Sequence, residues 1–301
     1  MRYQTPANLI FKNYFEPLVA AKHDPTRTRV TAVLPIIWLR AAAFSNALGN
    51  VAGLALHNWN DNDLEKALED CYDSPTKALR DLKDQLVVHF KNDNEVNVRL
   101  CPYCMLNEPN TWDHFLPKTF YPEFSVLHLN LVYVCWSCNH RKRDKYSQNE
   151  LEYCHPSYTV KPDEAVLHCH VSIQNGKLSI NFAAGLQDAA DEKAKIAHRH
   201  LVNLDLIRRY KLECASVFSS FIASLAQDLP GGVSEAVFKR NVEKRYHAIS
   251  NDFGVNYWEA RFWHGVWRCA GIVDYTNAKI NAYVPNMREG LEIDPPMALI
   301  A

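Results

Sequence analysis

Hydrophobic positions near the N-terminus recur every three or four residues, as they do on the buried face of a helix. Two such stripes stand out, one after Asp61 and one after Ser74: Leu64, Ala67 and Leu68, and then Leu79, Leu82, Leu86 and Val87. Ser74 followed by Pro75 is a typical helix start, because serine caps free backbone N–H groups and proline has none to leave unpaired. The pattern predicts a helical region over residues 1–95, in which we find no catalytic motif.

Strict alternation of apolar and polar residues replaces this helical spacing over residues 166–182. The apolar face of the alternating segment consists of Leu167, Cys169, Val171, Ile173, Leu178, Ile180 and Phe182. Asn175-Gly176 interrupts the alternation, and this pair favours the tight turn of a β-hairpin, in which both central residues take positive φ. The segment is therefore predicted to form a hairpin with one apolar face.

Helical spacing resumes from about Asp188 and continues to Leu225, until the Pro-Gly-Gly sequence of residues 230–232 breaks it. A further pair of helices is predicted around residues 233–250 and 256–270.

Two clusters in the C-terminal half have ordinary structural interpretations. His168 and His170 fall on the polar face of the predicted hairpin, opposite Cys169, so a second metal site that also includes His155 is not favoured. An aromatic stripe at helical spacing is interpreted as core rather than as a base-stacking platform. It consists of Trp258, Phe262, Trp263, Val266 and Trp267.

Composition narrows the class of protein. The 301 residues include 33 Lys+Arg and 34 Asp+Glu, for a net charge of −1, and 48% are hydrophobic. These values disfavour a disordered chain or a basic nucleic-acid coat, but they allow a local basic patch. The most apolar stretch, residues 30–56, is interrupted by polar residues and Pro35, and the N-terminus lacks a signal-like apolar core. We therefore expect a cytoplasmic protein without a membrane span.

Four of the nine cysteines form two pairs of identical spacing, Cys101-x-x-Cys104 and Cys135-x-x-Cys138. Two such turns supply the four thiolates that a tetrahedral structural Zn²⁺ requires, and the odd number of cysteines disfavours a disulfide framework. A closed four-thiolate site has no open position for substrate. The sequence therefore predicts a structural zinc site, with residues 105–134 inserted between its halves.

The inserted segment and the residues after it carry polar motifs. They are Asp113-His114-Phe115-Leu116-Pro117-Lys118, Tyr121-Pro122-Glu123-Phe124, Asn130-Leu131, and Asn139-His140-Arg141-Lys142 directly after the last cysteine. Together with the cysteine pairs, these motifs resemble the HNH, or ββα-metal, nuclease family. The resemblance is especially close to the HNH components of bacterial anti-phage systems such as Septu, which are encoded beside an ATPase. It is dense over residues 98–145 only.

The resemblance implies a role for each motif residue. His114 matches the histidine that takes a proton from the attacking water, and Asn130 matches the asparagine that holds the catalytic loop in shape. Asp113 and Asn139 match the residues that hold one catalytic Mg²⁺ or Mn²⁺. Asn139 stands where many members have a histidine, so His140, one residue later, is a further possible ligand.

Elementary chemistry agrees with this assignment. Phosphodiester hydrolysis needs an activated water and a cation to meet the developing charge. An imidazole with an ordinary pKa near ~6.5 can act as the base, and carboxylate and amide oxygens suit Mg²⁺. Adjacent strand residues point to opposite faces, however, so Asp113 and His114 can converge on one phosphate only if the backbone turns there.

Positive charge follows the second cysteine pair, at Arg141, Lys142, Arg143 and Lys145. We expect these residues at the start of a metal-site helix, where a helix N-terminus with added cations suits phosphate binding. Lys142 and Arg141 are predicted to contact the substrate.

The sequence therefore predicts an α+β protein with three parts: a helical region over residues 1–95, a zinc-stabilised HNH core over residues 96–150, and a β-hairpin with C-terminal helices over residues 151–301. The expected function is metal-dependent cleavage of nucleic acid, most simply DNA, as an anti-phage effector that acts with an ATPase from a neighbouring gene. The alternative is a non-catalytic, zinc-stabilised module that binds nucleic acid or serves an ATPase complex as an interaction subunit.

Overall fold

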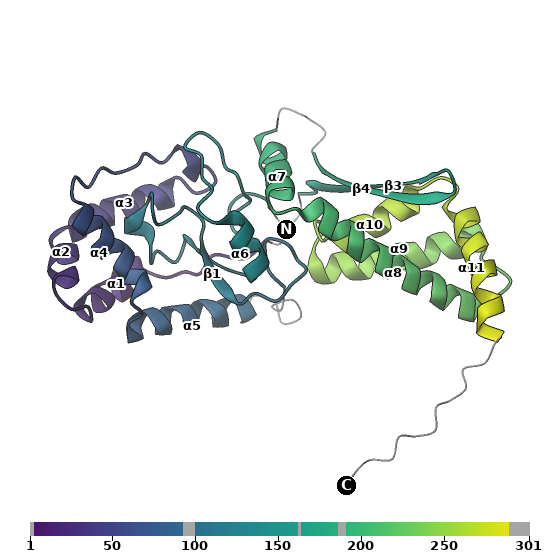
Figure 1. Ribbon diagram of the computed structural model, residues 1–301, viewed down its shortest axis with the longest axis horizontal. Coiled ribbons are helices and arrows are strands. Elements are labelled where there is room, and N and C mark those ends of the chain that lie inside the picture. Colours follow the sequence, from purple (N-terminus) through teal and green to yellow (C-terminus); the bar gives the residue numbers. More distant parts are fainter. Residues whose placement is uncertain (1–2, 93–99, 162–163, 186–190, 289–301) are drawn as a thin grey trace, which may run out of the picture.

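The computed structural model describes residues 3–92, 100–161, 164–185 and 191–288, and the predicted boundary between residues 95 and 96 lies outside them. Within this part of the chain, helices combine with two antiparallel strand pairs, which confirms the α+β class. The elements gather in two lobes, and α7 lies at the end of the second lobe that faces the first (Figure 1). No described helix has both the length and the apolar character needed to cross a membrane.

The first lobe begins with the N-terminal helices. They are α1 (Phe11–Ala20), α2 (Thr26–Ala32), α3 (Leu34–Asn46), the short 3-10 helix η1 (Val51–Gly53), α4 (Asn62–Asp73) and α5 (Lys77–Asn92). Both predicted stripes point inward, and all of their leucines are buried. Asp61 caps α4 by accepting from the backbone N–H groups of Asp63 and Leu64.

The predicted start of α5 was wrong by two residues. Thr76, not Ser74, caps α5, because its hydroxyl oxygen accepts from the backbone N–H of Leu79. Ser74 instead ends α4, and its hydroxyl donates to Asp70.

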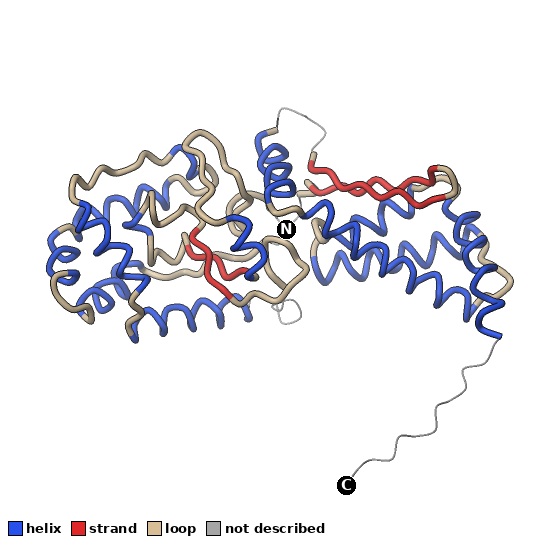
Figure 2. The backbone as a smooth tube through the Cα atoms, viewed as in Figure 1, coloured by secondary structure: helices blue, strands red, loops and turns tan. Residues whose placement is uncertain are grey.

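A small ββα arrangement lies among these helices (Figure 2). It consists of β1 (Thr111–His114), the 3-10 helix η2 (Pro122–Phe124), β2 (Leu131–Val134) and α6 (Trp136–Lys142). β1 and β2 are antiparallel, with Thr111 opposite Val134 and His114 opposite Leu131. A partly buried ion pair anchors the long loop between them to α3, since Arg40 Nε donates to Glu123 at 2.8 Å.

The second lobe contains the predicted hairpin, β3 (Leu167–Gln174) and β4 (Lys177–Ala184). Asn175 (φ 51°) and Gly176 (φ 69°) form its turn, as the sequence predicts. Helix α10 packs closely against β3: a Cβ at Gly265 would lie 2.6 Å from the carbonyl oxygen of Cys169. Glycine therefore lets the helix and the strand approach each other.

The helices of this lobe are α7 (Glu192–Asn203), α8 (Leu206–Asp228), α9 (Glu235–Phe253), α10 (Trp258–Arg268) and α11 (Ile272–Arg288). The helical pattern predicted from about Asp188, which is outside the described residues, divides into α7 and α8 at Asp205 (φ 54°). Helix α11 was not predicted. The aromatic stripe is core as predicted, except that Trp267 is 44% exposed.

The lobes meet around the first cysteine pair. Trp258 Nε1 of α10 donates to the carbonyl oxygen of Met105 at 3.2 Å. His200 Nε2 of α7 lies 2.9 Å from the carbonyl oxygen of Tyr103. Two helices of the second lobe thus hold the segment that carries Cys101 and Cys104.

Candidate functional site

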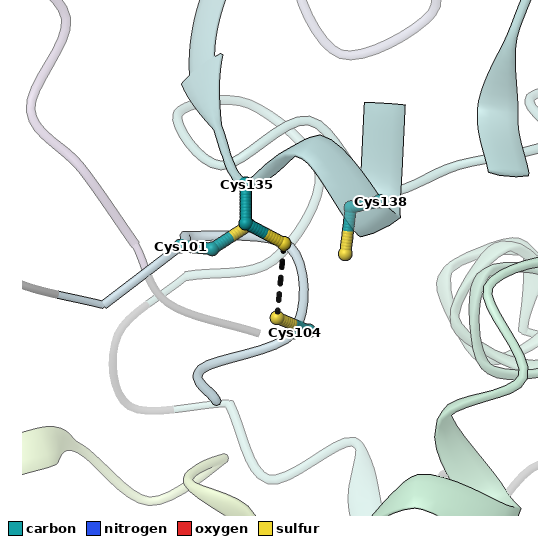
Figure 3. Close-up of side chains that lie close together, drawn as sticks. All are labelled: Cys101, Cys104, Cys135 and Cys138. Atoms are coloured by element: carbon teal, nitrogen blue, oxygen red, sulfur yellow. Dashed lines mark hydrogen bonds between the residues drawn. The ribbon is translucent and has the colours of Figure 1, made fainter. Parts of the chain in front are cut away.

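Two separate turns bring the four paired cysteines together. Cys101 and Cys104 lie on the loop before β1, and Cys135 and Cys138 lie at the start of α6; their side chains point toward one another (Figure 3). All four are buried, and their sulfur atoms lie within 4.8 Å of one another. The sulfurs of Cys104 and Cys135 are 3.8 Å apart. A tetrahedron with Zn–S bonds of about 2.3 Å has edges of about 3.8 Å, so the cluster fits a structural zinc ion.

Hydrogen-bond donors surround the cysteine cluster. Arg209 Nη1 of α8 donates to Cys138 Sγ at 3.5 Å, and Asn107 Nδ2 donates to Cys135 Sγ at 3.8 Å. Donors of this kind stabilise thiolates, which are the forms that bind metal.

Asp113, the predicted carboxylate ligand, is enclosed. Its side chain is 3% exposed, and both oxygens are engaged: Lys142 Nζ lies 3.1 Å from Oδ1, and the Tyr103 hydroxyl donates to Oδ2 at 2.8 Å. Burial raises the pKa of the Asp113 carboxyl, and the Lys142 ammonium opposes that rise. A divalent ion at this carboxylate would meet the ammonium group, so Asp113 does not fit a metal in this arrangement.

The basic run after Cys138 is placed differently from its prediction. Arg141 and Lys142 lie in the last turn of α6, not the first, where the helix dipole favours cations. Lys142 is fully buried, and besides Asp113 it donates to the carbonyl oxygen of His114 at 2.7 Å. Lys142, which was predicted to contact phosphate, is thus enclosed and paired with Asp113, whereas Arg141 is exposed and pairs weakly with Asp205 at 3.8 Å.

Asn139 and His140 do not join Asp113 either. Asn139 Nδ2 donates to the Thr111 hydroxyl at 3.0 Å and to the carbonyl oxygen of Trp112 at 3.2 Å, which fastens α6 to β1. His140 is exposed on the outer side of α6 and stacks on Trp136, with ring centroids 4.6 Å apart. The alternative assignment of His140 as a ligand beside Asp113 is thus not supported by its position.

His114 faces the side of β1 opposite Asp113. Its ring packs edge-on against Tyr72 of α4, with centroids 4.4 Å apart, and its Nε2 lies 2.7 Å from the carbonyl oxygen of Ser125. A carbonyl oxygen only accepts, so Nε2 carries the proton and Nδ1 carries the lone pair. Burial lowers the pKa of His114 to about 4, which keeps the ring neutral at physiological pH.

Asn130 joins the two ends of the loop that orients His114. Its Oδ1 accepts from the backbone N–H of Leu116 at 2.8 Å. Its Nδ2 donates to the carbonyl oxygens of Leu116 and Phe124, at 3.0 and 3.2 Å. Asn130 is fully buried, so these three hydrogen bonds hold the loop without help from solvent. The residue is placed as a loop-shaping role would require.

Residues of the N-terminal helices border His114, and the sequence pattern did not identify them. Lys83 Nζ of α5 lies 4.0 Å from the centre of the Tyr72 ring, and Lys118 Nζ lies 5.9 Å from it. Asp73 pairs with Lys118. Helical periodicity marks only the buried face of α4 and α5, so it contains no signal for residues that meet a distant strand.

The other histidines of interest lie apart. His155 is buried against Phe115, and His168 is exposed on the hairpin, where its Nε2 bonds the carbonyl oxygen of Gly185. Among the His, Cys, Asp and Glu residues of the described ranges, the four paired cysteines are the one group placed to share a metal ion.

Part of the chain is similar to a known phage protein. The chain resembles the protein ea31 of Escherichia phage lambda, with 27% identity over 175 residues, a stretch that covers 56% of this chain and 56% of the phage protein. The match thus spans little more than half of the phage protein's length. No family model matches the sequence, and no solved structure matches it.

Proposed function

We propose that the protein hydrolyses phosphodiester bonds of nucleic acid, with His114 as the general base. The observation that carries the proposal is the state of this imidazole. Nε2 is held by the carbonyl oxygen of Ser125, so the lone pair is on Nδ1, which has no hydrogen-bond partner among the described residues; the His114 side chain is only partly buried. A neutral ring with a fixed tautomer and an open lone pair can accept a proton from water.

The surrounding residues support this role by positioning. Ser125 is itself fixed, because its hydroxyl donates to the carbonyl oxygen of Leu68 at 2.7 Å. Asn130 closes the same loop. The order of β1, β2 and α6, with the cysteine cluster beside them, supports the proposal, because the HNH resemblance implies two strands followed by a helix.

A divalent ion, when bound, would meet the charge that develops on the phosphate and the leaving oxygen. In the present arrangement Asp113 and Asn139 do not fit such an ion, because Lys142 occupies the carboxylate and Asn139 bonds β1. We therefore assign no step to Mg²⁺ or Mn²⁺, and we propose that metal binding requires Lys142 to move. On the same resemblance we propose DNA as the substrate, anti-phage defence as the setting and a neighbouring ATPase as the partner.

The test is a cleavage assay on the purified full-length protein. Supercoiled plasmid is incubated with Mg²⁺ or Mn²⁺, and wild type is compared with His114→Ala and with His170→Ala, an exposed histidine of β3. Loss of a general base typically lowers the rate about 10²- to 10⁴-fold, so His114→Ala should nick far more slowly while His170→Ala matches wild type. Equal nicking by all three proteins would refute the proposal.

The buried ion pair of Lys142 and Asp113 favours a second candidate, a zinc-stabilised module that binds nucleic acid or a partner without cleaving. A closed carboxylate, fully paired and excluded from solvent, is what a structural role requires. Binding to plasmid or to the ATPase without any metal-dependent nicking, in the presence of that partner, would support this candidate over the nuclease.

A further inference from the structure

The end of α4 and the middle of α5 build a cationic rim beside His114. Tyr72, in the last turn of α4, packs against the His114 ring at 4.4 Å. Lys83 extends from α5 over the same tyrosine ring at 4.0 Å. Lys118, four residues after His114 in the chain, lies near that ring as well. The Tyr72 ring is therefore shared: it packs against the imidazole and has the two ammonium groups 4.0 and 5.9 Å from its centre.

Lys83 is a half-buried cation without a counter-ion. No carboxylate of the described residues lies within ion-pair distance of its ammonium group, and its contact is the face of Tyr72. Burial lowers the pKa of Lys83, and the more distant charge of Asp73 partly offsets that effect. The face of Tyr72 holds this ammonium group without neutralising its charge, so the charge remains available to an anion that approaches the Tyr72–His114 pair.

The acidic groups nearby do not fill this place. Asp73 is engaged with Lys118, whose side chain is 24% exposed. Glu69 of α4 lies in the same region, and burial raises the pKa of its carboxyl. Lys118 and Asp73 neutralise each other in the free protein, which leaves Lys83 as the cation available to a ligand.

We propose that Lys83, together with Lys118 once it leaves Asp73, binds a backbone phosphate of the nucleic acid and so holds the strand against His114. This assigns a role to the N-terminal helical region: α4 and α5 supply substrate contacts for the site whose general base, His114, lies on β1. This inference rests on the proposed function of His114, and it names the phosphate contacts that Lys142 cannot make because it is buried.

Binding is measured in a His114→Ala background, so that the probe stays intact. A short fluorescein-labelled DNA duplex, and its single strand, are titrated by anisotropy at several salt concentrations. Each lost phosphate contact lowers the slope of log affinity against log salt by about 0.9 on duplex DNA. We expect Lys83→Ala to weaken binding and to reduce the slope by about 1. Lys77→Ala, an 81% exposed lysine at the start of the same helix, serves as the matched control and should change neither value.

A footprint on unsubstituted Lys83 provides a second measurement. Lysine acylation followed by mass spectrometry should show Lys83 protected by DNA and Lys77 unprotected. Equal affinity and slope for the Lys83 and Lys77 variants, or an unchanged acylation of Lys83 on adding DNA, would overturn the inference; so would a failure to bind either probe.

The cleavage assay separates this inference from the proposed function. If wild type nicks plasmid and Lys83→Ala binds and nicks as wild type does, the phosphate contact is wrong while the role of His114 stands. If wild type binds DNA through Lys83 but never nicks it, the phosphate contact stands and the nuclease proposal fails.

Discussion

The cysteine cluster and the Asp113-His114 pair lie within the same ββα arrangement, yet only one of them is an assembled site. Four sulfur atoms from two distant turns converge within 4.8 Å of one another. Asp113 and His114, adjacent in sequence, diverge to opposite sides of β1, toward Lys142 of α6 and Tyr72 of α4. Nearness in the chain therefore says less about a shared site than the local geometry of each segment.

The reason is the backbone conformation at each place. A C-x-x-C turn points both thiols the same way, so packing two such turns together brings all four thiols into one site. A strand alternates its side chains, and β1 keeps its pairing with β2 as far as His114, so no turn rotates the two residues together. The two regions also differ in what holds them: the first has four thiols placed for a metal ion, and the second uses hydrogen bonds and a buried ion pair.

The largest effect should come from removing the metal. Apparent binding energies for structural zinc reach about 10–16 kcal/mol in small domains, and here Arg209 of the second lobe contacts the cluster. Cys104→Ser should abolish zinc binding, measured by mass spectrometry of the native protein, and should lower the melting temperature strongly. Cys269→Ser, a buried cysteine outside the cluster, is the control and should retain one zinc per chain. Full zinc content in the Cys104 variant would contradict the assignment.

The buried ion pair should give the next largest effect. Lys142→Met leaves the Asp113 carboxylate buried without its ammonium partner, which typically costs about 3–5 kcal/mol of unfolding free energy. Urea denaturation measures the loss, and Lys195→Met, a surface lysine, should be nearly neutral. The double variant Lys142→Met with Asp113→Leu should recover most of the stability. A Lys142→Met protein as stable as wild type would show that the pair is not closed in solution.

Acid should destabilise the loop between β1 and β2 by protonating His128. This effect is separate from any loss of zinc. His128 is 7% exposed, its Nδ1 lies 2.9 Å from the Tyr14 hydroxyl of α1, and burial lowers its pKa to about 4. The unfolded chain, with an ordinary pKa near ~6.5, binds the proton first, so this stability is complete above that pH and lost as the pH falls toward 4. The loss approaches about 3 kcal/mol at the acid end of this range.

The measurement is urea denaturation of wild type and His128→Gln between pH 7 and pH 5. Wild type should lose more stability over this range than the variant, because the variant has no imidazole to protonate at that position. Parallel curves for the two proteins would exclude His128 as a source of the acid sensitivity.

Local patterns in the sequence were sufficient for much of the fold. The stripes of α4 and α5, the Asn175-Gly176 turn and the cysteine turns all depend on residues within a few positions of one another, and each was found where predicted. The two wrong predictions in the helices also have local causes. Thr76, rather than Ser74, caps α5, and α11, which was not predicted, carries no clear apolar stripe.

The sequence by itself determined that a helical chain carries a hairpin and a four-cysteine cluster, because spacing alone places such groups on one side of a turn, helix or strand. Only the tertiary structure decided that Lys142 is buried against Asp113, that His114 faces the N-terminal helices, and that Lys83 lies over the same Tyr72 ring that packs on His114. Those contacts depend on which faces of distant helices and strands pack together. Burial, charge pairing and desolvation follow from that packing, and the pattern of a single segment does not contain them.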